Sequence, residues 1–246
     1  LRIRERPSSS RPAEPYGPFV ADLRSAEPEA ALTPAMTALV GAVCAEADAS
    51  SLDLTNSGCA HPAGDPSSSM LDLLNDLGQF GPTCRSTGMD CLGDGQDASY
   101  FFAPSKPLDA GQVYAVVSTL ATNTDNATYV GLSVNDMSTL KGVLNITDDA
   151  LNGSASTFEA AGQDFSKFFV HYFTRDCSLV QGLPPGTCTS VTADMVPRAG
   201  DDSAPGAKNL HGKFSAVIRS YVKPGTSRGP TSSEQLRPRV LTFVLT

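Results

Sequence analysis

The chain has 246 residues, of which 40% are hydrophobic and only 18% charged, and its formal net charge at pH 7 is −8. A chain of this length buries a substantial core, whereas its negative charge repels phosphate backbones, so we expect no nucleic-acid partner. Every unbroken apolar stretch is far shorter than the roughly 18–20 residues that cross a bilayer, so we expect no membrane span. A low charged fraction, compensated by Ser, Thr, Asn, Gly and Pro, is typical of extracellular proteins.

Residues 1–30 are predicted to form an extended or disordered arm, because they show no hydrophobic periodicity and contain several prolines. No apolar signal-peptide core follows Leu1, so we interpret the chain as a processed product whose signal has been removed. The arginines near this end also fit the tail of an organellar transit peptide. They are Arg2, Arg4, Arg6 and Arg11.

Residues 31–97 are predicted to form a helical region linked by cystines. A helix begins at Thr33-Pro34, a cap followed by proline in the first turn, and runs to about Ala49. Its apolar residues recur at helical spacing: Met36, Leu39, Val40 and Val43. The same spacing predicts a second helix with Gly78 as its C-cap. The apolar residues of that helix are Met70, Leu73, Leu74 and Leu77.

Residues 98–246 are predicted to form an antiparallel β domain, because the hydrophobic period changes from 3.6 to 2. The strand-like runs are 112–121, 127–135, 139–146, 167–175, 187–195, 213–222 and 239–245, and Thr147–Gly153 resembles a one-turn helix. Such a series predicts a mainly β fold, an antiparallel β-sandwich or jelly-roll-like domain that follows an N-terminal two-helix, disulfide-linked region. The apolar run at 239–245 would need covering or pairing, so self-association through edge strands is a further expectation.

Six cysteines without a C-x-x-C pair favour disulfides over zinc or redox chemistry. The alternative is six reduced thiols in a cytosolic protein. Local pairing predicts three bonds: Cys44–Cys59, Cys84–Cys91 and Cys177–Cys188. The last bond would close a hairpin around a Pro-Pro-Gly turn.

Three N-x-[ST] sequons lie on predicted loops, at Asn126, Asn145 and Asn152, which makes N-glycosylation an expectation. Together with the cysteines they predict an extracellular or cell-surface location, with the lumen of an organelle as the alternative.

No motif of a cofactor, metal or catalytic site stands out, so we expect no cofactor. The three histidines, His61, His171 and His211, share no metal-ligand spacing. His171 is either a general base or a partly buried structural residue. Arg175 and Asp176 form either a ligand clamp or a strand-end ion pair.

A calcium loop is suggested weakly by Asp94 and Asp97, which lack the rest of the EF-hand pattern.

Three functions remain open from the sequence. The first is a non-catalytic binding or assembly module with a carbohydrate or protein partner, where Tyr129, Tyr172 or Tyr221 could stack on a sugar ring. The second is an extracellular hydrolase of polysaccharide or ester, with Asp94, Asp97 or Asp176 near His171. The third is an organellar accessory subunit.

Overall fold

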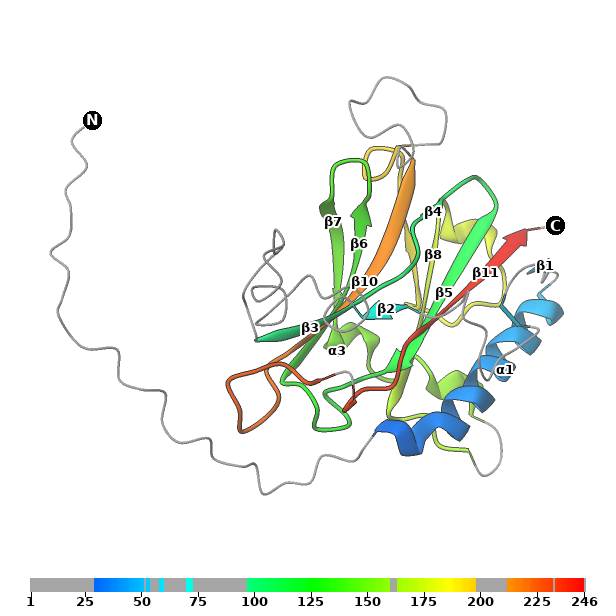
Figure 1. Cartoon of the computed structure of the whole chain (residues 1–246). Coiled ribbons are helices and arrows are strands. Elements are labelled where there is room, and N and C mark those ends of the chain that lie inside the picture. The colour runs from blue at the N-terminus through cyan, green and yellow to red at the C-terminus, as the bar shows by residue number, and fades with distance from the viewer. Residues whose placement is uncertain are drawn as a thin grey trace, which may run out of the picture.

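The computed structural model describes residues 29–50, 52–53, 58–59, 70–72, 97–159, 163–197, 212–231 and 233–245. These residues form a mainly β protein with two antiparallel-rich sheets and one long N-terminal helix (Figure 1). The predicted arm lies outside the described residues, apart from Glu29 and Ala30, which begin a 3-10 turn.

The first predicted helix is confirmed as α1, Thr33–Ala49, which follows the 3-10 turn η1, Glu29–Leu32. Pro34 lies in its first turn, where a missing N–H costs nothing. The residues buried along the helix are Met36, Leu39, Val40, Val43, Cys44 and Ala47, which include the four expected from the spacing. Thr33 is not the cap, because η1 extends the helical path and the Thr33 hydroxyl donates to the carbonyl of Ala30 at 2.7 Å.

The second predicted helix is wrong at its start. Leu71 and Asp72 form the short strand β2, Leu71–Asp72, which pairs antiparallel with Phe102 and Phe101. The backbone N–H of Met70 donates to the carbonyl of Pro238 at 3.1 Å, and the side chain is fully buried. Tertiary pairing therefore overrides the helical spacing of a short apolar run, which periodicity alone cannot assign. Residues 73–96 lie outside the described residues.

The first sheet has the strand order β1-β11-β5-β8-β9. Its strands are β1 (Leu52–Asp53), β11 (Arg239–Leu245), β5 (Gln112–Thr119), β8 (Phe168–Thr174) and β9 (Cys188–Ser190). All neighbours are antiparallel except β8 and β9, which pair in parallel. The run at 112–121, apolar on both faces, is accordingly a central strand. The C-terminal run lies between β1 and β5, but β1 pairs only with its last residues, Val244 and Leu245.

The second sheet has the strand order β2-β3-β10-β6-β7, and all of its pairs are antiparallel. Its further strands are β3 (Ala98–Phe102), β10 (Lys213–Tyr221), β6 (Tyr129–Asp136) and β7 (Lys141–Thr147), and the short β4 (Lys106–Pro107) also pairs with β10. The predicted one-turn helix is present as α3, Asp148–Leu151, directly after β7.

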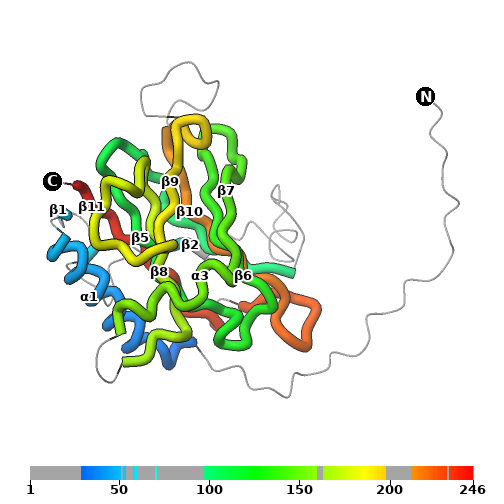
Figure 2. Tube along the Cα trace, turned by 180° about the vertical axis from the view of Figure 1, so that it is seen from behind, coloured from blue at the N-terminus to red at the C-terminus, as the bar shows by residue number. Residues whose placement is uncertain are grey.

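Two apolar clusters explain how these layers hold together. One takes Tyr114 and Val116 from β5 together with Val130 and Leu132 from β6, so the two sheets share a core. The other joins α1 to the opposite face of the first sheet, including Val113, Ala115 and Val117 of β5. In both views α1 lies on the side of the first sheet that faces away from β6 and β7 (Figures 1 and 2). Burial of these side chains is the main stabilising contribution to the fold.

The helical stretch Glu29–Ala49 has 21 residues and contains an 18-residue window with a mean hydropathy of 1.5. By length and composition it is the one helix in the described part of the chain that could cross a bilayer. Core helices of water-soluble proteins meet the same criterion, and α1 packs its apolar stripe on the first sheet. The expected absence of a membrane span stays a prediction.

Two disulfides tie short segments to this framework. Cys44 of α1 is bonded to Cys59 with a Cα–Cα distance of 5.9 Å, and Cys177 is bonded to Cys188 with a Cα–Cα distance of 6.0 Å. The pairing predicted between Cys84 and Cys91 lies outside the described residues. Both observed bonds favour an oxidising environment, such as the extracellular space or the lumen of an organelle.

The hairpin predicted around Cys177 and Cys188 is wrong. The chain leaves β8, makes the 3-10 turn η4 (Cys177–Leu179) and returns to pair with β8 in parallel. The strand expected over 187–195 is shortened to β9, because turns occupy residues 193–195 and Met195 and Val196 both donate backbone N–H groups to the carbonyl of Thr192.

Candidate ligand-binding face

His171 lies in the core between the sheets and is not positioned as a general base. Its side chain is 2% exposed, and its ring centroid is 5.1 Å from that of Phe173. Its Nε2 atom is 2.9 Å from the hydroxyl of Thr189, whereas the buried Nδ1 atom has no partner. Burial lowers the pKa of His171 from 6.5 to about 4. A ring nitrogen in this environment does not meet a substrate in solvent.

Arg175 serves as a structural connector. Its Nε donates to the carbonyl of Leu108 at 2.6 Å. Its terminal nitrogens donate to further carbonyls at 2.7–3.2 Å, those of Val191, Thr192, Val196 and Pro197. These bonds fix the 191–197 turn against the end of β8, which satisfies backbone groups that no strand pairs.

Asp176 has a local role at the start of η4. Its exposed carboxylate accepts from the backbone N–H of Ser178 at 2.9 Å and from the Ser178 hydroxyl at 2.7 Å. These hydrogen bonds lower the pKa of Asp176. The structure therefore does not bring His171 and Asp176 into one hydrogen-bonded acid–histidine arrangement.

The weak calcium prediction gains no support. Asp94 lies outside the described residues, as do His61 and His211, and Asp97 is exposed just before β3. Within the described ranges, no group of three His, Cys, Asp or Glu residues could hold a metal ion.

The three sequon asparagines differ sharply in exposure. Asn126 was expected on an accessible loop, yet it is 1% exposed, and its Nδ2 donates to Glu29 at 3.1 Å and to the carbonyl of Glu234 at 3.2 Å. Because Nδ2 is the atom that a glycan would occupy, this fold leaves no room for a sugar there. Asn145 and Asn152 are exposed. Asn145 lies on strand β7, not on a loop, and Asn152 follows α3.

Polar and aromatic side chains lie on the outer face of the second sheet, opposite the shared core. Along β10, Ala216 and Ile218 enter the shared core, so Arg219 and Tyr221 fall on the other side. The antiparallel register places Arg219 opposite Tyr100 of β3. We call this surface the tyrosine face and define it by Tyr100, Tyr129, Gly131, Ser133, Asn145, Arg219 and Tyr221.

Its aromatic residues contact one another across three strands. The ring centroids of Tyr129 and Tyr221 are 5.6 Å apart at an interplanar angle of 49°. The Arg219 guanidinium carbon lies 5.5 Å from the centre of the Tyr100 ring, within the range of a cation–π contact. Burial is the main cause that raises the pKa of Tyr100, and the neighbouring Tyr221 raises it further. The hydroxyl of Tyr100 therefore stays protonated at neutral pH.

Gly131 gives this face its shape. A Cβ atom at this position would lie 2.8 Å from the Asn145 Oδ1 atom and 3.3 Å from the Tyr129 hydroxyl. Without that atom, Asn145 and Tyr129 lie over the middle of the sheet, where the Asn145 amide donates to the Tyr129 hydroxyl at 3.0 Å. A glycine inside a strand commonly marks such a close approach.

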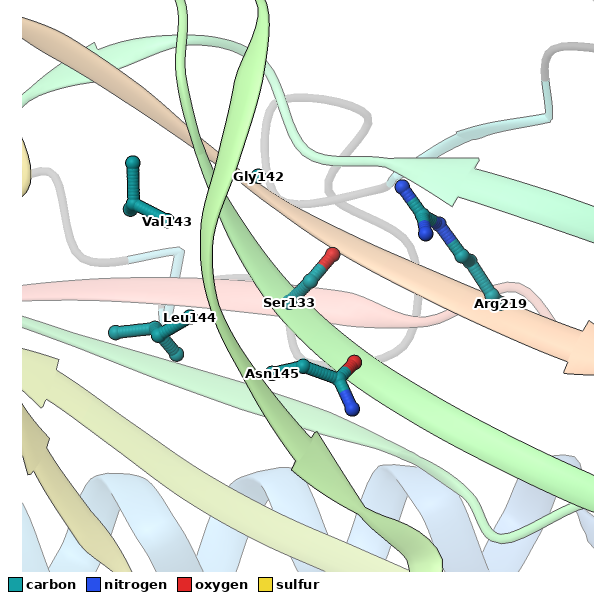
Figure 3. Close-up of a pocket in the computed structure, with 6 residues that line it drawn as sticks. All are labelled: Ser133, Gly142, Val143, Leu144, Asn145 and Arg219. Carbon is teal, nitrogen blue, oxygen red and sulfur yellow. The ribbon is translucent and has the colours of Figure 1, made fainter.

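An open pocket of about 350 Å³ adjoins these residues (Figure 3). It is lined by Ser133, Gly142, Val143, Leu144, Asn145 and Arg219. The polar ends of Ser133, Asn145 and Arg219 all lie on the same side of the sheet in Figure 3. The Arg219 Nε atom is buried and has no hydrogen-bond partner. The Ser133 hydroxyl makes only long contacts, at 3.4 Å to Asn135 and to the carbonyl of Val217.

Sequence reasoning identified part of this face. Tyr129 and Tyr221 were candidates for sugar stacking, and both are partly exposed here. Tyr172 is wrong as a candidate, because it is 2% exposed and packs in the cluster beneath α1. Arg219 and Gly131 were missed. The alternation in 127–135 placed Gly131 beside Tyr129 and Ser133, and that was the available signal.

Comparisons of the chain with protein-family models, with curated proteins and with solved structures find no match. The fold is mainly β, with two antiparallel-rich sheets and an N-terminal helix held by a disulfide. The described part of the chain carries an open pocket on the outer face of the second sheet, and Tyr129 and Tyr221 lie on the same face outside the pocket lining.

Proposed function

We propose that this chain is a secreted or cell-surface, non-catalytic binding module of β-sandwich architecture, and that it binds carbohydrate on the tyrosine face. The shared core of the two sheets supports the architecture, and the two disulfides support the compartment. N-glycosylation at Asn152, the exposed sequon outside the pocket lining, belongs to the same proposal.

The observation that carries the ligand class is the pair Tyr129 and Tyr221 beside an open polar pocket. Sugar rings present an apolar face of C–H groups and an edge of hydroxyls. Partly exposed tyrosine rings supply an apolar surface with a polar tip. Asn145 and Arg219 supply hydrogen-bonding groups within the adjoining pocket.

Among the residues that the structure describes, no comparable arrangement supports the hydrolase alternative. The histidine that it requires is buried in the core, and its hydrogen bond goes to a threonine hydroxyl. A binding role without catalysis therefore accounts better for the described residues.

The test is a panel of soluble oligosaccharides, with binding measured by isothermal titration calorimetry on the full chain and on variants of the tyrosine face. We expect Tyr129→Ala to weaken binding about tenfold or more, because a stacked ring contributes on the order of 1–2 kcal/mol. Tyr129→Phe keeps the ring and should retain most of the affinity. The matched control is Leu179→Ala, which shortens an exposed apolar side chain on η4.

The proposal fails if no saccharide binds, or if Tyr129→Ala and Leu179→Ala bind a saccharide as tightly as the unaltered chain.

A further inference from the structure

Arg219 is the one cation in the lining of the pocket on the tyrosine face. The described residues offer it the Tyr100 ring but no carboxylate within salt-bridge distance. Its Nε–H is buried without an acceptor, although burial of a charged donor is costly unless a partner satisfies it. Other arginines show the usual outcome, since Arg175 donates to five carbonyls and Arg228 pairs with Glu234.

The groups near Arg219 also suit an anion. Asn145 lies exposed in the lining of the same pocket and carries a hydrogen-bond donor. Asn145 uses its amide toward Tyr129, and an amide nitrogen has a second N–H to offer. A guanidinium flanked by neutral donors matches the planar, two-oxygen geometry of a carboxylate.

We infer that the ligand of the tyrosine face is an acidic saccharide, whose carboxylate binds Arg219 while a sugar ring lies against Tyr129 and Tyr221. This inference rests on the proposed carbohydrate-binding function and specifies its ligand. A polymer with many acidic groups fits poorly, because the chain itself carries a formal charge of −8. The ligand is therefore a short or sparsely charged saccharide with one carboxylate at the pocket.

The experiment compares an oligosaccharide that ends in a uronic acid with the methyl ester of the same compound, using calorimetry at about 0.15 M salt. We expect the acid to bind at least about tenfold more tightly than the ester, because charge-assisted hydrogen bonds are about twice as strong as neutral ones. Arg219→Gln should abolish this difference while leaving the weaker binding of the ester. Arg219→Lys should retain only part of the preference, because an ammonium group cannot form the two-pronged contact.

A second variant changes the shape of the tyrosine face without changing Arg219. Gly131→Ala places a methyl group where Asn145 and Tyr129 lie, so it should weaken binding of the acid and the ester alike. Thermal unfolding of each variant establishes that the protein is folded before its binding is measured.

The outcomes separate the two proposals. If the acid and the ester bind equally and Tyr129→Ala weakens both, the inference of an acidic ligand is overturned and carbohydrate binding stands. If neither compound binds, and no oligosaccharide of the wider panel binds either, both proposals are overturned.

Discussion

Glu29 shows at the scale of a single residue how distant segments are held together. Its carboxylate is fully buried and accepts hydrogen bonds from Thr119, Thr124, Asn126 and the backbone N–H of Leu236, at 2.6–3.1 Å. These donors come from the end of β5, the loop that follows it and the segment before β11. One side chain in η1 thereby fixes the N-terminal turn to three parts of the β framework.

Replacing Glu29 by Gln tests this role. The variant turns one acceptor oxygen into a donor that faces other donors, so we expect the free energy of unfolding to fall by about 2 kcal/mol. Urea denaturation measures the change. Glu46→Gln, an exposed position on α1, is the control and should change stability by less than about 0.5 kcal/mol. Equal effects of the two substitutions would contradict the role assigned to Glu29.

His171 makes stability depend on pH in a defined window. Its pKa is about 4 in the folded protein and 6.5 as the ordinary value, so between these values the unfolded chain binds a proton that the folded chain does not. Its contribution is fully present above pH 6.5 and is lost as the pH falls toward 4. At pH 5 the loss from this one residue is about 2 kcal/mol.

The corresponding variant is His171→Phe, which keeps a ring in the core and cannot titrate. We expect the difference in unfolding free energy between pH 7.5 and pH 5 to be about 2 kcal/mol smaller in this variant than in the unaltered chain. Denaturation curves at both pH values give the comparison. An unchanged difference would mean that His171 does not control the acid sensitivity.

At the scale of elements, the parallel pair β8–β9 is the feature that needs covalent support. Parallel neighbours need a crossover connection, and here the crossover is a short segment without a full helix. The Cys177–Cys188 bond and the Arg175 hydrogen bonds hold that segment against the sheet.

Removing this bond by Cys177→Ser together with Cys188→Ser should lower the free energy of unfolding by about 3 kcal/mol, because the closed loop spans 11 residues. Saccharide binding should not change, since the bond lies on the first sheet and the tyrosine face on the second. Chemical denaturation and calorimetry on the same sample check both statements. A loss of binding in a folded variant would contradict this separation of the two sheets.

The elements that the sequence predicts well are those whose signal is local. The stripe of α1, the two-sided apolar run of β5 and the alternation in β6 each lie within one segment, so their spacing predicts the element. The burial of Asn126 depends on Glu29, 97 positions away, and β2 depends on pairing with β3, which no local pattern encodes. Arg219 and Gly131 of the tyrosine face were missed for the same reason, because Arg219 meets Tyr100 and Gly131 only through strand register.

At the scale of the whole molecule, exposure of the sequons determines where sugar chains fit. In protein secreted from a eukaryotic host we expect an N-glycan at Asn152 and none at Asn126. Peptide mapping after enzymatic deglycosylation in heavy-oxygen water identifies the occupied sites. A glycan at Asn126 in folded protein would contradict the burial of that side chain.

Asn145 belongs both to a sequon and to the wall of the pocket, where its amide nitrogen touches Tyr129. An N-linked glycan on that nitrogen would cover the surface that we assign to the ligand. The glycan would then block the ligand-binding face. Unglycosylated protein made in a bacterial cytoplasm and glycosylated protein made in a secretory pathway would differ in ligand binding. The choice of expression host thus becomes an experimental variable in its own right.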